Sequence, residues 1–424
     1  MNIPKTDKPR IVVIGGGFGG ISFIKKMNRA KVQVVLFDRH NYHTFQPLLY
    51  QVSTAGLEPD SIAYPLRKIF RERDDFHFRM AEVEEVDPEK NEIHTSIGSL
   101  SFDYLVIATG TRTNFFNNKG IQENGMPMKT IPQALNMRSL ILQNIEEADI
   151  TDDPEEKRQL LNFVIVGGGP TGVELAGALA EFRKGILEND YPQLRIEDMR
   201  VHLIEGGDRV LAPMSKQSSN KALKFLEGLG VEVHLNSLVK DYDGTTVTLE
   251  DGRTSKAKTF IWAAGVTGSP VRGIKANSLI ERSNRYVVDS FNRIEGYEHL
   301  FALGDVAKMV TEQFPEGHPQ VAQPAIQQGK RLGRNFRRML KGKEMKPFKY
   351  FDKGTMATIG RNKAVVDIKN INFGGAFAWF VWMFVHLWFL VGFRNRVITF
   401  FNWTYNYINY DRAARLIIRP FKKN

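Results

Sequence analysis

Two glycine-rich loops have the residue types and the spacing to bind the phosphates of a dinucleotide. In the first, Gly15, Gly17 and Gly20 have the spacing GxGxxG and follow Arg10–Ile14, a β-branched run that is typical of a buried parallel strand. The first glycine makes a tight turn, the second lets a pyrophosphate approach the backbone, and the third packs the next helix against the strand. The helix predicted over Ile21–Asn28 would point the positive end of its dipole at those phosphates. The loop also contains Phe18 and Gly19.

An acidic residue stands where the ribose of that dinucleotide would lie. The segment Val32–Phe37 predicts a second strand, and Asp38 follows it directly, 18 residues after Gly20. A carboxylate at this point can accept hydrogen bonds from ribose hydroxyls. A GxGxxG spacing alone is a weak signal, but one framed by strand, helix, strand and acid is specific.

The same frame occurs a second time in the chain. Gly167, Gly169 and Gly172 follow a strand predicted over Asn162–Val166, and a helix is predicted over Val173–Leu187. Pro170 and Thr171 complete this loop. Two such frames in one chain predict two dinucleotide sites.

The acid of the second frame is Glu205, which ends the strand predicted over Arg200–Ile204. It lies 33 residues after Gly172, so we expect an extended helix or an excursion over residues 184–199. An acid at this position favours NADH, because it would repel the 2′-phosphate of NADPH. Arg209 is near enough in sequence to keep NADPH open.

The absence of cysteine among the 424 residues excludes several classes of protein. Disulfide scaffolds, cysteine zinc sites, iron–sulfur proteins and dithiol mechanisms all need cysteine. We assign no metal ligands from the sequence. A composition of 42% hydrophobic and 25% charged residues is that of a globular protein, and the length suggests about three domains of roughly 150 residues.

The C-terminal end of the chain is basic and aromatic. Residues 321–424 carry a net charge of +16, whereas residues 1–320 carry −5. Fifteen aromatic residues lie between Asn372 and Tyr410. The run Ala376–Phe393 has no formal charge apart from a protonatable histidine, and as a helix it would be about 27 Å long. That is marginal for crossing a hydrocarbon core of about 30 Å.

We therefore predict two helices in the membrane–water interface, one over Ala376–Phe393 and one over Val397–Tyr410. A single spanning helix and the core helix of a dimer interface are the alternatives, and nucleic acid binding is disfavoured because such an apolar run is not typical of it. The residues expected to contact the membrane are Trp379, Trp382, Trp388, Trp403, Arg394 and Arg396, followed by a basic tail of Arg412, Arg415, Arg419, Lys422 and Lys423. The apolar run Ile11–Ile14 is too short for a signal peptide, so a prokaryotic cytoplasmic face is expected.

The spacing of the two frames resembles the pyridine nucleotide-disulfide reductase superfamily of flavoproteins. Tyr104–Gly110 and Phe260–Gly265 both end a strand in a small-residue motif, and Leu300–Ala307 is similar to the late FAD motif of that superfamily. The resemblance implies an α/β fold in which a second Rossmann-like domain is inserted into the first. It places FAD-binding residues at 1–115 and 295–350, the NADH-binding domain at 116–294 with a β-meander over Lys240–Lys258, and a C-terminal membrane-binding region at 351–424. Besides the first loop and Asp38, the implied FAD-binding residues are Arg39, Val83, Thr109, Gly110, Gly304 and Asp305, and Gly265 joins the NADH site.

Three further segments are similar to type II NADH dehydrogenases, the single-subunit NADH:quinone oxidoreductases: Asn41–Leu57, Val321–Gly329 and Lys353–Gly360. The resemblance implies that NADH passes a hydride to FAD and that two electrons then go to a membrane quinone. It places Gln323 and Gln327 at the quinone. It places Glu174 near flavin and nicotinamide, where it orders the nicotinamide or relays protons; the alternative is an acid stabilised by the helix dipole. His43 and His386 are expected to be structural.

The expected partners are NADH, a membrane quinone and an anionic lipid surface, with no nucleic acid, and the sequence leaves a homodimer open. We expect attachment to the cytoplasmic side of the cell membrane. We expect no proton pumping, because the chain lacks several spanning helices with ionisable groups. Two other functions stay open at this point: an NADH-dependent reductase of a soluble acceptor such as oxygen or a ferredoxin-like protein, and a redox-sensing flavoprotein that does not turn over.

Overall fold

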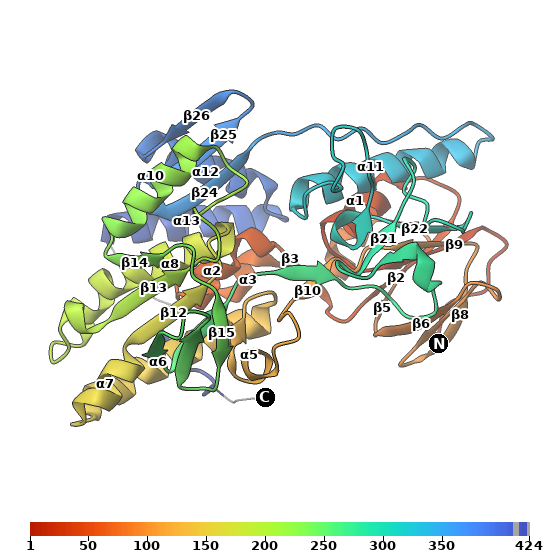
Figure 1. The fold of residues 1–424 in the computed structure, drawn as a ribbon. Helices are drawn as coiled ribbons and strands as arrows, with labels where there is room; N and C mark the ends of the chain where they lie inside the picture. Colours follow the sequence, from red (N-terminus) through yellow and green to blue (C-terminus); the bar gives the residue numbers. More distant parts are fainter. Residues whose placement is uncertain (410–414, 422–424) are drawn as a thin grey trace. The chain divides into compact units, whose positions relative to one another are not determined.

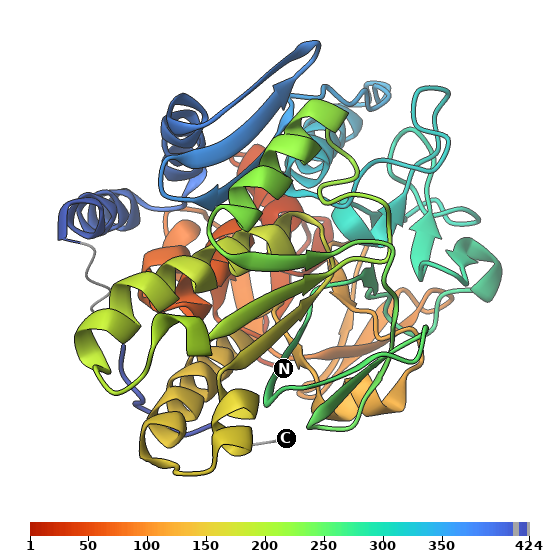
Figure 2. The same ribbon diagram turned by 60° about the vertical axis from the view of Figure 1, so that its left-hand side comes forward.

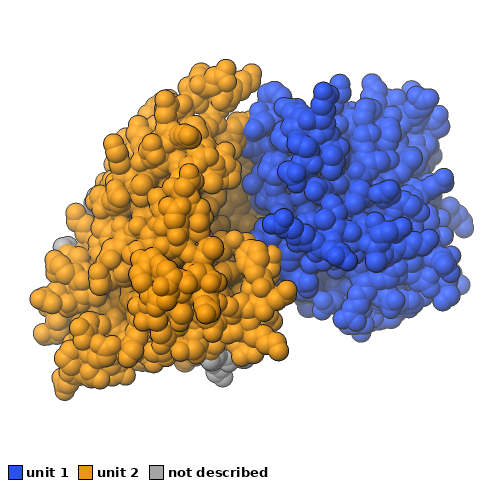
Figure 3. Space-filling model, in the orientation of Figure 1, with its two compact units in different colours: residues 1–43, 64–112, 266–352 blue, residues 44–63, 113–265, 353–424 orange. Residues whose placement is uncertain are grey.

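Each glycine loop belongs to its own unit in the computed structural model, which describes residues 1–409 and 415–421 (Figure 3). Unit 1 consists of residues 1–43, 64–112 and 266–352, and unit 2 consists of residues 44–63, 113–265 and 353–424. Tyr410, Arg412, Lys422 and Lys423 of the predicted membrane region lie outside the described residues.

Unit 1 is built on a parallel sheet of five strands in the order β22-β9-β1-β2-β5. Its central strand β1 sends Val12 and Ile14 to one hydrophobic cluster and Ile11 and Val13 to the other. Because both faces are covered, the strand is apolar at every position after Arg10 rather than at every second one. The strands are β1 (Arg10–Ile14), β2 (Gln33–Asp38), β5 (Phe76–Met80), β9 (Tyr104–Ile107) and β22 (Leu300–Ala302).

Two helices of unit 1 lie side by side next to the first loop, α1 (Phe18–Lys26) and α11 (Ala322–Met339) (Figure 1). The rings of Phe23 and Phe336 meet edge to face with 5.2 Å between centroids. A Cβ on Gly329 would lie 2.4 Å from the carbonyl oxygen of Gly19, so glycine is needed for this close approach. The approach fixes the middle of α11 against the start of α1. Unit 1 also contains an antiparallel sheet of β6 (Val83–Asp87), β7 (Glu92–Thr95) and β8 (Gly98–Ser101). A mixed sheet has β20 (Leu279–Ile280) antiparallel to β21 (Arg285–Val287), which pairs in parallel with β23 (Ala307–Lys308).

Unit 2 repeats the arrangement, with a parallel sheet in the order β11-β18-β12-β13-β14. The second loop connects β12 to α8 (Pro170–Phe182), which continues as a π-helical turn over Arg183–Leu187. The predicted meander is confirmed by β15 (Val239–Tyr242), β16 (Thr246–Leu249) and β17 (Thr254–Lys256). The sheet strands are β11 (Met126–Pro127), β12 (Asn162–Val166), β13 (Arg200–Ile204), β14 (Val231–His234) and β18 (Thr259–Trp262).

A small antiparallel sheet begins the C-terminal region, and it packs on α8 and on α10 (Lys216–Glu227), as Figure 2 shows. Asp367 accepts hydrogen bonds from the Ser215 amide (2.6 Å) and the Ser218 hydroxyl (2.5 Å) at the start of α10. These bonds tie the C-terminal sheet to the second dinucleotide domain. The strands are β24 (Thr355–Gly360), β25 (Lys363–Ile368) and β26 (Ile371–Gly374).

The two predicted C-terminal helices are present as α12 (Ala376–Phe389) and α13 (Phe393–Asn409). Their boundary differs from the prediction, since extended backbone at Leu390 and a left-handed Gly392 (φ 91°) end the first helix early. Arg394 and Arg396 consequently lie in the first turn of α13 rather than in the connection. Over residues 1–409 and 415–421, we find no helix with the length and apolar character that a membrane crossing requires.

The predicted fold class, two Rossmann-like α/β domains followed by a helical C-terminal region, is confirmed. Apart from shifts of two or three residues at 113–115 and 351–352, the two units differ from the predicted domain limits in three segments. Residues 266–294 join unit 1, where β21 pairs with β23. Residues 44–63 and 353–424 join unit 2, where α2 (Leu49–Ser53) and β24 both contact α8.

Candidate functional site

The first loop has an open side that fits a pyrophosphate. A Cβ on Gly15 (φ 105°) would lie 2.4 Å from the Ala108 carbonyl oxygen, and one on Gly20 would lie 2.0 Å from the Gly15 carbonyl oxygen. A Cβ on Gly17, by contrast, would have no described atom within 4 Å. Gly17 is also the N-cap of α1, and no side chain caps that helix. This is the arrangement in which a phosphate takes the place of a cap.

Asp38 holds the first loop in shape. Its carboxylate accepts hydrogen bonds from the amides of Gly16 (2.6 Å) and His40 (2.8 Å). Burial raises the pKa of Asp38, and the two amides oppose that shift. An ionised carboxylate has about four acceptor positions, so two are left for ribose hydroxyls. Thr109, whose amide nitrogen would lie 3.2 Å from a Cβ on Gly15, has a buried hydroxyl that bonds to nothing in the described chain, as a ligand-facing group would.

The late FAD motif is held by a residue that the sequence did not single out. The amide of Gly304 (φ 74°) donates to Oε1 of Gln328 at 2.7 Å, and Gln328 is 1% exposed. The main-chain oxygen of Asp305 accepts from Gln320 at 3.1 Å. Gln328 lies in the same run, Val321–Gly329, as the predicted quinone ligands, and its burial was the only feature that distinguished it.

Four of the predicted site residues lie in unit 1 outside the two turns described above. Gln327 donates to the Phe351 carbonyl oxygen (2.8 Å) and accepts from the Phe351 amide (3.1 Å), so its carboxamide anchors the segment after α11. Gln323 is half-buried in the first turn of α11. Arg39 is exposed and lies 3.8 Å from Glu82, and Val83 begins β6.

The second loop is built like the first. A Cβ on Gly167 (φ 111°) would lie 2.7 Å from the Ala263 carbonyl oxygen, a Cβ on Gly172 would lie 1.9 Å from the Gly167 carbonyl oxygen, and Gly169 is open. Glu205 accepts from the amides of Gly168 (2.5 Å) and Gly207 (2.6 Å). Asp38 and Glu205 therefore play the same part in their loops. Each accepts a hydrogen bond from the second residue of its loop, Gly16 or Gly168, and another from the amide two residues after itself.

The surroundings of the second loop fit NADH. Arg209, which kept NADPH open, donates to the carbonyl oxygens of Met214 (3.1 Å) and Ala212 (2.6 Å). Its guanidinium is therefore engaged by main chain. Pro170 and Thr171 are exposed at the start of α8, and a Cβ on Gly265 would lie 2.9 Å from the ring of Phe116.

A cavity of about 140 Å³ in unit 2 contains the carboxyl group of Glu174. Glu174 lies on α8 and is 8% exposed, and its Oε1 accepts from the Thr358 amide at 3.4 Å. Burial raises the pKa of Glu174 to about 8, against the opposing effects of the Thr358 amide and the Trp382 indole. The carboxyl group is therefore mostly protonated at pH 7. Other residues that line the cavity are Tyr50, Gln51, Trp379, Trp403 and Tyr407.

The prediction that four tryptophans contact the membrane needs correction. Trp382 (1% exposed) and Trp403 (8% exposed) pack against each other at 5.7 Å, and Trp403 donates to Oε1 of Gln51 at 2.8 Å. Trp379 is half-buried and stacks on Tyr407. Only Trp388, 64% exposed, could reach lipid fully. The sequence could not distinguish the buried tryptophans of α12 from the exposed one. The helix packs one face on the protein and leaves the other in solvent, and tryptophan occurs on both faces.

The exposed face of the two C-terminal helices is instead made mainly of phenylalanine. Its members are Phe377, Phe380, Phe384, Trp388, Phe389, Phe393, Phe400, Phe401, Tyr405 and Ile408, each at least 41% exposed. Of the nearby arginines, Arg394 lies 3.5 Å from Asp60, and Nε of Arg396 donates to the Leu390 carbonyl oxygen at 2.9 Å.

Of the two histidines expected to be structural, His43 is buried and the side chain of His386 is half-buried. Nδ1 of His43 lies 3.0 Å from the Gly16 carbonyl oxygen, and Nδ1 of His386 lies 2.7 Å from that of Trp382. Burial lowers the pKa of each imidazole to about 4. Each ring is neutral at pH 7 and must donate through Nδ1, since a carbonyl oxygen can only accept.

Two protein-family models together match most of the chain. Residues 9–329 match the pyridine nucleotide-disulphide oxidoreductase family, and residues 353–409 match the NDH2 C-terminal domain. The chain is 35% identical to the type II NADH:quinone oxidoreductase NdhA of Mycobacterium tuberculosis, over 96% of this chain and 89% of that protein. It is 30% identical to the type II NADH:quinone oxidoreductase of Haemophilus influenzae, over 85% and 87% of the two chains.

A solved structure of NDH2 from Plasmodium falciparum in complex with NADH has the same fold, with a TM-score of 0.88. The two chains are 22% identical, and the similarity covers 97% of this chain and 100% of that one.

Substituting the open glycine of each loop separates the two predicted nucleotide sites. Gly169→Ala should weaken NADH binding at least tenfold, because lost hydrogen bonds to a charged phosphate cost about 1.5–3 kcal/mol. It should leave FAD content and the melting temperature unchanged, because a Cβ there has free space. Gly17→Ala is the matched control and should lower FAD retention instead. Calorimetry with NADH and the flavin absorbance provide both measurements, and a Gly169→Ala protein with wild-type NADH affinity would contradict the assignment.

The raised pKa of Glu174 predicts a pH dependence of stability. Between about pH 5 and 8 the folded protein keeps a proton that the unfolded chain releases, so the free energy of unfolding falls as pH rises through this window. Glu174→Gln should abolish that part of the fall, whereas the exposed Glu147→Gln on α6 (Ile131–Ile150) should not. Thermal melts at pH 5.5, 7 and 8.5 measure the difference, and parallel curves for wild type and Glu174→Gln would refute it.

Proposed function

Since the chain belongs to the type II NADH:quinone oxidoreductase family, we propose that it oxidises NADH and reduces a membrane quinone without pumping protons. The observation that carries this proposal is the repeated loop: two open glycine loops, each held by a carboxylate at the end of the next strand. A single-nucleotide reductase needs one such site, and an enzyme that passes a hydride from one dinucleotide to another needs two.

FAD fits the residues of unit 1. The Gly15–Gly20 loop and the start of α1 would hold its pyrophosphate, Asp38 its adenosine ribose, and the Gly304–Asp305 turn the far end of the cofactor. Bound there, FAD would supply the chemistry that accepts a hydride and releases two electrons. Gln328 acts as a positioning residue, because it fixes the Gly304 amide from α11.

NADH fits the second loop. The Gly167–Gly172 loop would hold its pyrophosphate at the start of α8, and Glu205 its adenosine ribose. Glu205 also disfavours the 2′-phosphate of NADPH, while Arg209 is engaged by main-chain oxygens and offers that phosphate little.

We propose Glu174 as the residue that supplies a proton during quinone reduction. Forming a quinol requires two protons as well as two electrons, and a carboxyl that is protonated at pH 7 can give one up. A neutral carboxyl gains nothing from the helix dipole, so the alternative of an acid placed only for the dipole loses support. The walls of the cavity around Glu174 combine tryptophan and tyrosine rings with the polar side chains of Gln51, Glu181 and Arg361, which suits a substrate with an apolar ring and polar oxygens. Gln323 stays a proposed quinone ligand.

We propose that the phenylalanine-rich face of α12 and α13 rests on the lipid surface, at the cytoplasmic side of the membrane. Large apolar side chains are exposed repeatedly along both neighbouring helices, and amphipathic helices at the interface use such residues to contact lipid. Attachment there would bring the enzyme to a substrate that stays in the bilayer.

Turnover on sealed vesicles tests the proposed function. FAD-loaded protein is added with NADH to vesicles that contain a quinone and a trapped pH indicator. One quinol should form per NADH oxidised, and the internal pH should not change. Oxidation of NADH without quinol would refute the acceptor, and a change of internal pH would refute the absence of pumping.

Charges placed on the phenylalanine-rich face should release the protein from lipid. Phe377→Glu and Phe384→Glu should each lower binding to phosphatidylcholine–phosphatidylglycerol vesicles at least about tenfold, because burying a phenylalanine is worth roughly 1.5–3 kcal/mol. NADH-dependent reduction of a soluble dye should be retained. Ile150→Glu is the matched control, since Ile150 is 79% exposed on α6 and not on this face. Flotation assays measure the binding, and flotation of a Phe377→Glu/Phe384→Glu double variant at the wild-type level would contradict the assignment.

A further inference from the structure

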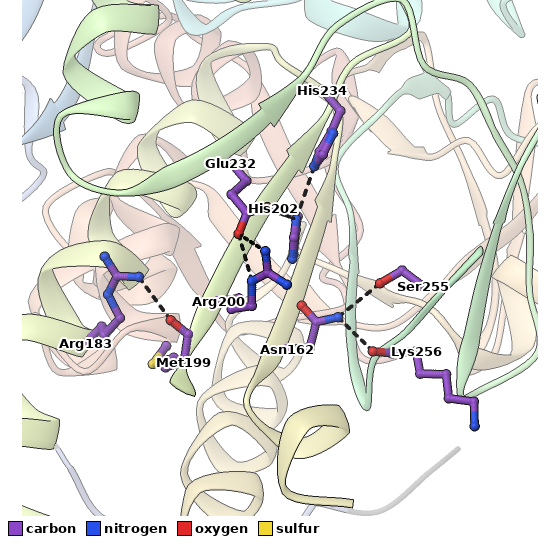
Figure 4. A network of polar contacts seen from close by, with 9 residues as sticks. All are labelled: Asn162, Arg183, Met199, Arg200, His202, Glu232, His234, Ser255 and Lys256. Atoms are coloured by element: carbon purple, nitrogen blue, oxygen red, sulfur yellow. Dashed lines mark hydrogen bonds and ion pairs between the residues drawn. The ribbon is translucent and has the colours of Figure 1, made fainter. Parts of the chain in front are cut away.

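Two histidines and a glutamate form a cluster on neighbouring strands of unit 2, apart from the residues assigned above (Figure 4). The register of β13 and β14 places His202 directly opposite Glu232, and His234 follows Glu232 by two residues. Since side chains alternate along a strand, all three lie on the same face of the sheet. Neither the dinucleotide loops nor the cavity around Glu174 includes any of them.

The donor atoms of this cluster already have the separations of metal ligands. Nδ1 of His202 lies 3.1 Å from Nε2 of His234 and 3.5 Å from Oε2 of Glu232. All three donor atoms lie within 4.8 Å of one another. Ligands of a tetrahedral Zn²⁺ at bond lengths of 2.0–2.1 Å are about 3.3 Å apart. The third separation, between Glu232 and His234, is at most 4.8 Å and completes the triangle.

A neighbouring arginine orients the carboxylate for this purpose. Nε and Nη2 of Arg200 both bind Oε1 of Glu232, at 2.8 and 2.7 Å, so the other oxygen is left facing His202 (Figure 4). Metal-ligating carboxylates are commonly held by a hydrogen bond of this kind.

The imidazoles are equally constrained and suited to binding. Their rings stack with 5.4 Å between centroids and 24° between planes. Each ring offers one nitrogen to the cluster, Nδ1 of His202 and Nε2 of His234. The cations that act on the cluster, Arg200 and Arg253, each pair with a carboxylate, so they do not leave a net positive charge there.

We propose that His202, Glu232 and His234 form a binding site for Zn²⁺, with water as the fourth ligand. Two imidazole nitrogens and one carboxylate oxygen are a donor set for a borderline transition-metal cation, whereas Mg²⁺ and Ca²⁺ prefer oxygen donors throughout. The site adjoins the NADH loop, because the main-chain oxygen of His234 accepts from the amide of Glu205 at 2.8 Å. A bound cation would hold β13 and β14 together close to the end of β13, which Glu205 follows directly.

The site is tested on the full-length, FAD-loaded protein. The protein is treated with a chelator, the chelator is removed, and the binding of Zn²⁺ is then measured by calorimetry. One Zn²⁺ should bind per chain. His202→Ala and His234→Ala should each weaken binding by more than the roughly 10- to 100-fold that loss of an outer-shell partner causes. His94→Ala is the matched control and should bind as the wild type does, because His94 also has a carboxylate neighbour, Glu92 at 3.5 Å, and yet belongs to no described cluster of three.

X-ray absorption at the zinc edge is measured on the wild type, so its result does not depend on whether the histidine variants fold. The spectrum should show two imidazole ligands at about 2.0–2.1 Å. The proposal fails if the wild type binds no Zn²⁺ at one per chain, if the spectrum shows no imidazole, or if both histidine variants keep wild-type affinity.

Discussion

A hydrogen bond from a glycine amide to a strand-end carboxylate sets the architecture of both nucleotide sites. Asp38 binds the Gly16 amide and Glu205 binds the Gly168 amide, and in each case the other carboxylate oxygen binds an amide two residues further on. The bond fixes the loop so that the space beside its third residue, Gly17 or Gly169, stays open. The first and last glycines of each loop lie so close to backbone that a side chain would not fit. A polar group that is buried must be paired, so removing the carboxylate would leave a loop amide without its partner. The same physical solution, used twice, gives one chain two binding sites for anionic dinucleotides.

The C-terminal region completes unit 2 rather than simply attaching to it. A Cβ on Gly177 would lie 1.7 Å from the Ile359 carbonyl oxygen, so α8 and β24 approach each other as closely as backbones can. Thr358, next to this contact on β24, brings its amide to 3.4 Å from Glu174, and the burial of the carboxyl group raises its pKa. The chemical state of Glu174 on a dinucleotide-binding helix therefore depends on residues about 180 positions later. The same region turns its phenylalanine-rich face outward, which joins the proposed proton donor and the proposed lipid contact in one structural element.

Sequence reasoning succeeded where the signal is local. The glycine spacing, the β-branched runs and the acids predicted both sheets and both loops, because each motif is a continuous strand–turn–helix. It failed where the burial of a side chain decides its role. Trp382 and Trp388 have the same residue type on one helix, yet one is interior and the other exposed. Gln327 and Gln328 are adjacent, but only Gln328 supports the Gly304 turn. His202, Glu232 and His234 became a cluster only through the pairing of β13 with β14, which no spacing in the sequence reveals.

Anaerobic reduction followed by reoxidation tests the central claim, that this chain links a soluble dinucleotide to an apolar acceptor through two nucleotide sites. The FAD-loaded protein is mixed with one equivalent of NADH in the absence of oxygen and then with a quinone, while the flavin absorbance is followed. The account predicts that NADH bleaches the flavin completely and that the quinone restores its colour within the turnover time. A flavin that NADH does not bleach, or one that stays bleached in the presence of quinone, would contradict it.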